Sequence, residues 1–204
     1  MSNFSRRTLL RSSALAAFAW CVPEMWPLAG TPAGPAASPL PAAAKTGSGR
    51  MTIVEDFLDE VRQSHAYTLE CAQSMPGDKY GFRPVPEVRS FGQQMVHIAE
   101  AMPGLFDLFI EGRGTPSHAL SEAGKEQFSS KADVIARLEE SFGYVGNAAQ
   151  RLKDKALKAR VQAFGREMTK RRMLRFLLDH TTHHRGQAIV YLRINGIRPP
   201  TYRA

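Results

Sequence analysis

The sequence has few cysteines and no long apolar run, and each shortage excludes a class of protein. Only two cysteines, Cys21 and Cys71, occur among 204 residues, so no internal disulfide framework is expected to hold the fold together. No apolar run reaches the roughly 18 residues of a membrane-spanning helix, so we expect no stable membrane insertion. Hydrophobic residues nevertheless make up 43% of the chain, which is enough for a packed core.

A clustered basic face is also lacking, although the net charge is +8. Residues 1–50 supply half of this excess, because they carry five basic residues and one acidic residue. Proteins that bind nucleic acid present their basic side chains together on one face. The nearest grouping, residues 170–172 with Arg175, is explained more simply as the solvated start of a helix. We therefore expect no nucleic-acid partner.

Residues 1–50 have the composition of a leader rather than of a folded domain. Arg6 and Arg7 precede an apolar stretch over residues 14–22, and a Pro/Ala/Gly-rich segment follows. This order is typical of a secretory signal, and the paired arginines resemble a twin-arginine export signal. We expect a periplasmic or exported protein whose folded domain is residues 51–204. The alternative is translation from Met51, which would give a cytoplasmic protein.

Helical periodicity dominates residues 51–204. Thr52 followed by Glu55 has the pattern of a capping box at a helix start. The expected helices cover about residues 52–75, 91–110, 130–152 and 169–194, with Pro103 kinking or shortening the second. No segment shows a sustained period of two, so no strand is expected. Four long helices in one domain predict an all-α, four-helix bundle.

One face of the fourth expected helix carries a pair of histidines. At roughly 100° per residue, His184 lies about 40° from His180, and Gln187 lies about 20° away on the other side. Met173 and Tyr191 fall on the same stripe, so we expect this stripe to face the core. Two histidines four residues apart on one helix face can bind a metal ion through their imidazole nitrogens.

The second expected helix offers a third histidine, His97, within an otherwise small and apolar stripe. Ala101 and Gly104 follow on that stripe, and such small neighbours would leave room for a metal ion and a guest molecule. Three histidine ligands with an open fourth position are typical of catalytic zinc. We predict that His97, His180 and His184 converge on one divalent transition metal. The alternative without metal is that these histidines are polar groups of the core with hydrogen-bond partners.

Other polar residues are weaker candidates. His65 lies on the first expected helix and could face the same cavity, whereas His118 lies in a loop and is expected in solvent. Glu100, one turn past His97, is the one carboxylate that we would test as a general base. Cys71 is expected to be a small core residue without a catalytic role.

Side chains near the histidine pair could support it. Gln187 or Tyr191 could orient a substrate, and His183 lies at the edge of the stripe. Arg185 and Asp179 could hydrogen-bond to the ligand histidines, although their angles point them off the stripe. Partners of this kind are expected at metal sites, because the second nitrogen of a ligand imidazole is normally hydrogen-bonded.

Two parts of the sequence carry a resemblance to a known family. Residues 180–187 (HTTHHRGQ), with YLR at 191–193, Gly196 and PP at 199–200, look like the last helix of DinB-like (YfiT-like) metalloproteins. Residues 82–84 (FRP) and 90–99 (SFGQQMVHIA) look like the start of that family's second helix. The likeness extends over about residues 52–200.

The resemblance implies a bundle that binds one divalent cation through His97, His180 and His184, with His183 as a neighbour. In the family the metal is often zinc, nickel or iron, dimers are common, and some relatives are transferases or isomerases that use a low-molecular-weight thiol. We expect a metal-dependent transferase or hydrolase acting on a small molecule, with such a thiol as cosubstrate, and a homodimer. The alternative is a non-catalytic, stress-related protein that binds metal or a small ligand.

Overall fold

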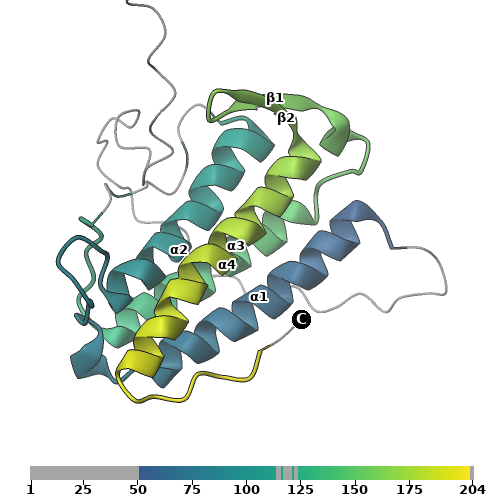
Figure 1. The fold of residues 1–204 in the computed structure, drawn as a ribbon. Helices are drawn as coiled ribbons and strands as arrows, with labels where there is room; N and C mark the ends of the chain where they lie inside the picture. Colours follow the sequence, from purple (N-terminus) through teal and green to yellow (C-terminus); the bar gives the residue numbers. More distant parts are fainter. Residues whose placement is uncertain (1–50, 114–115, 117–120, 122–123, 203–204) are drawn as a thin grey trace, which may run out of the picture.

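Four helices form the framework of the computed structural model, which describes residues 51–113, 116, 121 and 124–202 (Figure 1). These helices are α1 (Ile53–Ser74), α2 (Phe91–Leu105), α3 (Lys131–Ala149) and α4 (Lys170–Ile194). The expected leader and His118 lie outside the described residues. Within the described part of the chain, no helix has both the length and the apolar character needed to cross a membrane.

Local capping chemistry sets the helix ends. The Thr52 hydroxyl accepts from the Glu55 backbone N–H, and the Glu55 carboxylate accepts from the Thr52 N–H, which confirms the expected capping box. A second box joins Ser90 and Gln93 at the start of α2. Beyond α4, Gly196 adopts a φ of 72°, a left-handed conformation that glycine tolerates and that ends the helix.

Pro103 does not shorten the helical path of α2. The path changes after Leu105 from an α-helix to a π-helix over Phe106–Glu111, so it ends close to the expected residue. Proline cannot donate the backbone hydrogen bond to the residue four positions earlier. The π-helix begins three residues after Pro103, and such wide turns are rare.

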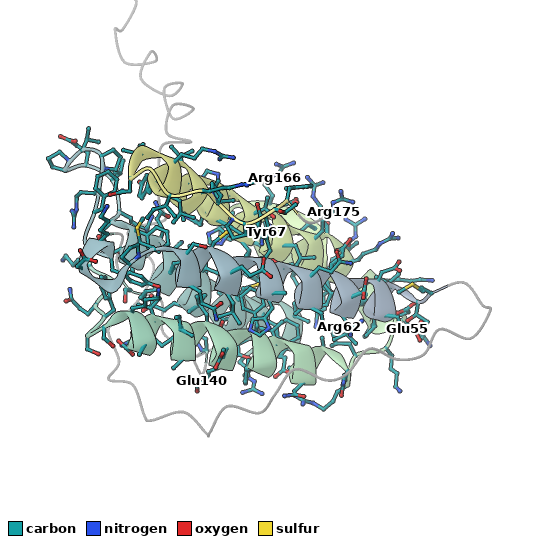
Figure 2. The ribbon with its side chains drawn as sticks, turned by 90° about the horizontal axis from the view of Figure 1, so that it is seen from below. Glu55, Arg62, Tyr67, Glu140, Arg166 and Arg175 are labelled. Carbon is teal, nitrogen blue, oxygen red and sulfur yellow. The ribbon has the colours of Figure 1, made fainter. Side chains whose placement is uncertain are left out.

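Each helix packs mainly against two others. α1 and α2 both contact α3 and α4, so α1 and α2 lie diagonally across the bundle. Figure 2 shows α1 between α4 on one side and α3 on the other. The core between the helices consists of fully buried apolar side chains, among them Val61, Cys71, Met95, Ile98, Leu138, Phe142, Met173 and Leu177. Burial raises the pKa of the Cys71 thiol to about 11, as suits a core residue without a catalytic role.

A β-hairpin next to the start of α4 was not expected. β1 (Arg160–Ala163) pairs antiparallel with β2 (Arg166–Thr169), in a register that places Arg160 opposite Thr169. The turn residues Phe164 and Gly165 have φ values of 52° and 70°, as required in a two-residue turn with both residues left-handed. The four-helix bundle prediction is confirmed, and the expectation that no strand occurs is wrong. Strands this short and exposed leave no period-two pattern to detect.

Candidate metal centre

The packing of α2 against α4 brings three histidines together. His180 and His184 lie one turn apart on α4, and His97 lies midway along α2. One ring nitrogen of each histidine lies within 4.8 Å of the other two, so the cluster could hold a metal ion. The closest approach joins His97 Nε2 and His180 Nε2 at 3.3 Å.

This spacing fits a shared transition metal. Zinc–nitrogen bonds of about 2.0–2.1 Å at tetrahedral angles place two ligand nitrogens about 3.3 Å apart. The observed distance between His97 Nε2 and His180 Nε2 is the same, 3.3 Å. Without a cation or a proton between them, two such nitrogens would direct their lone pairs at each other. The donor set, three imidazoles, suits zinc, nickel and iron alike.

A hydrogen bond fixes the orientation and the tautomer of the His184 ring. Gln94 Oε1 lies 2.8 Å from His184 Nδ1, and an amide oxygen only accepts, so the ring proton belongs on Nδ1 and Nε2 is left with its lone pair. Gln94 Nε2 donates to Gln187 Oε1 at 2.6 Å, and Gln187 Nε2 lies 2.8 Å from Nε2 of the exposed His183. Gln187, which was predicted to orient a substrate, is therefore linked to His184 through Gln94.

Burial keeps the imidazoles of the cluster neutral. Loss of water, together with neighbouring histidines and Arg89, lowers the pKa of His180 to about 4 and that of His184 to about 2. Desolvation also lowers the pKa of His97 far below its usual range. Histidine binds metal only when deprotonated. At neutral pH, protons therefore do not compete with a cation for these nitrogens.

A buried carboxylate that sequence reasoning missed lies beside His97. The Glu126 side chain is 0% exposed, and its Oε1 lies 2.5 Å from Arg89 Nε and 3.6 Å from His97 Nδ1. Glu126 Oε2 and His97 Nδ1 are both buried without a hydrogen bond. Glu126 belongs to the segment between α2 and α3, where no periodicity assigns residues to a face. The sequence therefore offers no signal that links Glu126 to His97.

Other predicted candidates have partners elsewhere. The Glu100 carboxylate accepts from the Ser121 backbone N–H and hydroxyl, both at 2.9 Å, and burial raises its pKa. Tyr191 is buried in the core. His65 stacks on the Phe142 ring of α3, and burial lowers its pKa to about 4. The histidine cluster contains none of these three.

Arg185 is buried between α4 and α1 rather than beside the histidines. Its Nη1 donates to the Ser64 hydroxyl at 2.9 Å and to the Thr68 hydroxyl at 3.2 Å. The guanidinium lies 4.7 Å from the centre of the Tyr67 ring, and Figure 2 shows Tyr67 on the α4 side of α1. Asp179 is exposed. Arg185 therefore links α4 to α1, and none of its described contacts is with the histidine cluster.

Aromatic rings connect the hairpin with the histidines. Phe164 at the hairpin turn lies 5.5 Å from Phe109 and 5.1 Å from Phe176, measured between ring centres. The Phe176 ring lies 6.0 Å from the His180 ring. One side of the cluster is therefore bordered by apolar rings.

Comparisons with known proteins point to one family. The family model described as the DinB superfamily matches residues 37–188. The chain is 24% identical over 131 residues to the uncharacterized protein YjoA of Bacillus subtilis (strain 168), a match that covers 63% of this chain and 82% of that protein.

Solved structures share the fold. A DinB-like protein from Bacillus cereus ATCC 10987 superposes with a TM-score of 0.59 at 21% identity, covering 73% of this chain and 97% of that one. The crystal structure of YjoA from Bacillus subtilis gives a TM-score of 0.58 at 22% identity, covering 74% and 97% of the two chains. At these identities the likeness concerns the fold.

Proposed function

We propose that this chain, which belongs to the DinB superfamily, is a metal-dependent transferase that joins a low-molecular-weight thiol to a small electrophile. His97, His180 and His184 would hold one divalent transition metal. The observation that carries the proposal is the convergence of their ring nitrogens within 4.8 Å. A divalent cation bound there would act as a Lewis acid and lower the pKa of a coordinated thiol.

The protein's own residues would prepare the site for this chemistry. Gln94 holds His184 in the tautomer whose Nε2 is free to bind. Burial keeps the imidazoles of the cluster uncharged at neutral pH and raises the strength of electrostatic interactions within it. In the transfer, a sulfur–carbon bond forms, the leaving group departs from that carbon, and the thiol proton passes to solvent.

Thiol transfer is favoured over hydrolysis by the positions of the carboxylates. A hydrolase benefits from a carboxylate free to take a proton from water. Glu126 is paired with Arg89, and both oxygens of Glu100 bind Ser121. A thiol needs less help from a base, because its pKa is already much closer to neutrality than that of water.

The aromatic rings beside His180 support the proposal that the electrophile has an apolar part. Phe176 lies next to His180, and Phe164 from the hairpin turn lies next to Phe176. Apolar and aromatic linings are usual in small-molecule sites, where a few polar groups fix the reacting atoms.

Elemental analysis of the full-length chain, purified without a histidine tag, tests the metal site. We expect about one equivalent of transition metal in the wild type and little in His180→Ala/His184→Ala. The matched control is His183→Ala, which removes an exposed histidine of the same helical turn and should keep its metal. Absence of metal from all three proteins, even after incubation with zinc or nickel, would contradict the proposal.

Turnover separates the enzyme from the alternative of a non-catalytic binder. The metal-loaded protein is mixed with a thiol and an aromatic or alkyl electrophile, and the thioether product is followed by chromatography. Saturable product formation that disappears in the double variant supports the transferase. Stoichiometric metal without turnover of any thiol–electrophile pair would favour the binder.

A further inference from the structure

We infer that Glu126 is a positioning residue for His97, because its carboxylate accepts the Nδ1 proton of that ring and so directs Nε2 to the cluster. This inference rests on the proposed metal site and adds to it a residue outside the helices. It concerns a contact between α2 and the segment that leads into α3.

Two unsatisfied atoms of the same pair point to this role. His97 Nδ1 and Glu126 Oε2 are both buried without a hydrogen bond, and His97 Nδ1 lies 3.6 Å from Glu126 Oε1. Buried polar atoms in folded proteins nearly always have partners. An N–H bound to a carboxylate has an ordinary length of about 2.8 Å. A shift of less than about 1 Å would therefore satisfy the ring nitrogen.

The tautomer that this contact selects is the one that a metal site needs. His97 Nε2 faces His180 Nε2 at 3.3 Å, so its lone pair must point into the cluster if it is to bind a cation. A neutral imidazole carries one proton, which then lies on Nδ1, facing Glu126. Ligand histidines commonly donate this second N–H to a carboxylate or a carbonyl. Gln94 supplies the equivalent acceptor for His184.

Arg89 pairs with the Glu126 carboxylate in the core. Buried ionisable groups need a close partner of opposite sign, and Arg89 Nε lies 2.5 Å from Glu126 Oε1. The pair leaves Glu126 Oε2 available, because a carboxylate can accept several hydrogen bonds.

Contacts on both sides of Glu126 hold its backbone against α2. Gln93 Nε2 donates to the Gly124 carbonyl at 2.6 Å and reaches the Glu126 carbonyl at 3.5 Å. On the other side, the Phe128 ring fills the space where a side chain at Gly92 would lie. A carboxylate fixed in this way can orient a ring, whereas one on a loose loop could not.

The test compares substitutions of Glu126 with that of another buried carboxylate in the full-length chain. Glu126→Ala removes the acceptor, and Glu126→Gln keeps an oxygen that can still accept. The matched control is Asp107→Asn, because Asp107 is also 0% exposed, lies 3.9 Å from Arg113 and binds the Tyr144 hydroxyl. It lies roughly 15 Å along the helix from His97.

Zinc affinity is measured first, by competition with a chromophoric chelator. We expect Glu126→Ala to weaken zinc binding by about 10- to 100-fold and Glu126→Gln by less. Asp107→Asn should change it by less than about twofold, because distant sites act independently. Equal affinities for the wild type and both Glu126 variants would overturn the inference, as would an equal loss in Asp107→Asn.

The tautomer of His97 is then read in the metal-free protein from two-bond ¹H–¹⁵N NMR spectra, with the signal assigned by a His97→Gln variant. We expect the Nδ1–H form in the wild type and in Glu126→Gln, and loss of this preference in Glu126→Ala. An unchanged Nδ1–H form in Glu126→Ala would overturn the inference. This measurement needs no metal, so it distinguishes a failure of the Glu126 role from a failure of the proposed function. If the alanine variant does not fold, the wild type decides, because an Nε2–H form of His97 there would overturn the inference.

Discussion

Acid should destabilise the metal-free protein, because its core holds imidazoles that accept a proton less readily than those of the unfolded chain. A histidine of the unfolded chain has a pKa near 6.5, whereas burial lowers the pKa of His180 to about 4 in the folded protein. Between these values the unfolded chain binds more protons than the folded one. The contribution of these histidines to the free energy of unfolding should therefore be constant above about pH 7 and fall as the pH drops from 6.5 towards 4.

The size of the loss follows from the two pKa values of His180. At pH 5 the unfolded ring is almost fully protonated and the folded ring about one-tenth protonated, which costs about 2 kcal/mol of stability. His184, with a pKa of about 2, should contribute a similar loss at pH 5. Together these are a large part of the roughly 5–15 kcal/mol that stabilises an ordinary domain.

Urea unfolding followed by circular dichroism, with a chelator present, measures this effect at pH 7.5 and pH 5. The wild type should lose about 2 kcal/mol more than His180→Gln between these pH values. His183→Gln, which removes an exposed histidine of the same turn, should behave as the wild type. If His180→Gln lost as much stability as the wild type, the buried neutral ring would not be the cause.

Four further substitutions test the packing in and around the cluster. Gln94→Ala should weaken zinc binding by about tenfold in a chelator competition. Gln187→Ala should weaken it by less, because Gln187 is linked to His184 through Gln94. A larger effect of Gln187→Ala than of Gln94→Ala would contradict this order. Gly92→Ala should cost about 1–3 kcal/mol in urea unfolding, because its new methyl group would overlap the Phe128 ring. Gly186→Ala should instead stabilise the protein by up to about 1 kcal/mol, because nothing lies within 4 Å of the added carbon and alanine favours helix. Equal effects of the two glycine substitutions would show that the Phe128 contact is not tight.

The helices could be predicted because their signals are local. Each start has a side chain that can accept from the first free backbone N–H groups, as at Thr52 and Ser90. The turn of the hairpin was less visible, because Phe164 occupies a left-handed position that the sequence pattern usually assigns to glycine or asparagine. Its strands pair through backbone hydrogen bonds, so no particular residue type marks this pairing in the sequence.

The histidines on α4 could be found from one helix, whereas the rest of the site depends on packing. The spacing of His180 and His184 fixes their shared face, but the approach of His97 requires α2 and α4 to be neighbours. Glu126 depends on a further step, the folding of a non-helical segment onto α2. Residues of that kind can be found only after the helices have been placed.

Arg185 shows why a single stripe describes α4 incompletely. The helix contacts both α2 and α1, so two arcs of its surface are buried. The arc towards α2 carries the histidines, and the arc towards α1 carries Arg185, which binds Ser64 and Thr68. Arg185 lies off the predicted stripe and is nevertheless buried, because a helix in this bundle packs against two neighbours and so buries two sides.

The neutral state of the clustered imidazoles affects both the stability of the folded protein and the proposed binding of a metal ion. Imidazoles that resist protonation cost the folded protein stability in acid, and the same property leaves their nitrogens available to a cation at neutral pH. Zinc bound to the folded state should raise the free energy of unfolding at every pH by an amount set by its concentration and affinity. It should not remove the acid sensitivity, because unfolding would still release histidines that bind protons. Stabilisation by zinc that is lost in His180→Gln is therefore the behaviour expected of a cation held by these buried rings, whereas a cation bound at surface carboxylates would stabilise His180→Gln as much as the wild type.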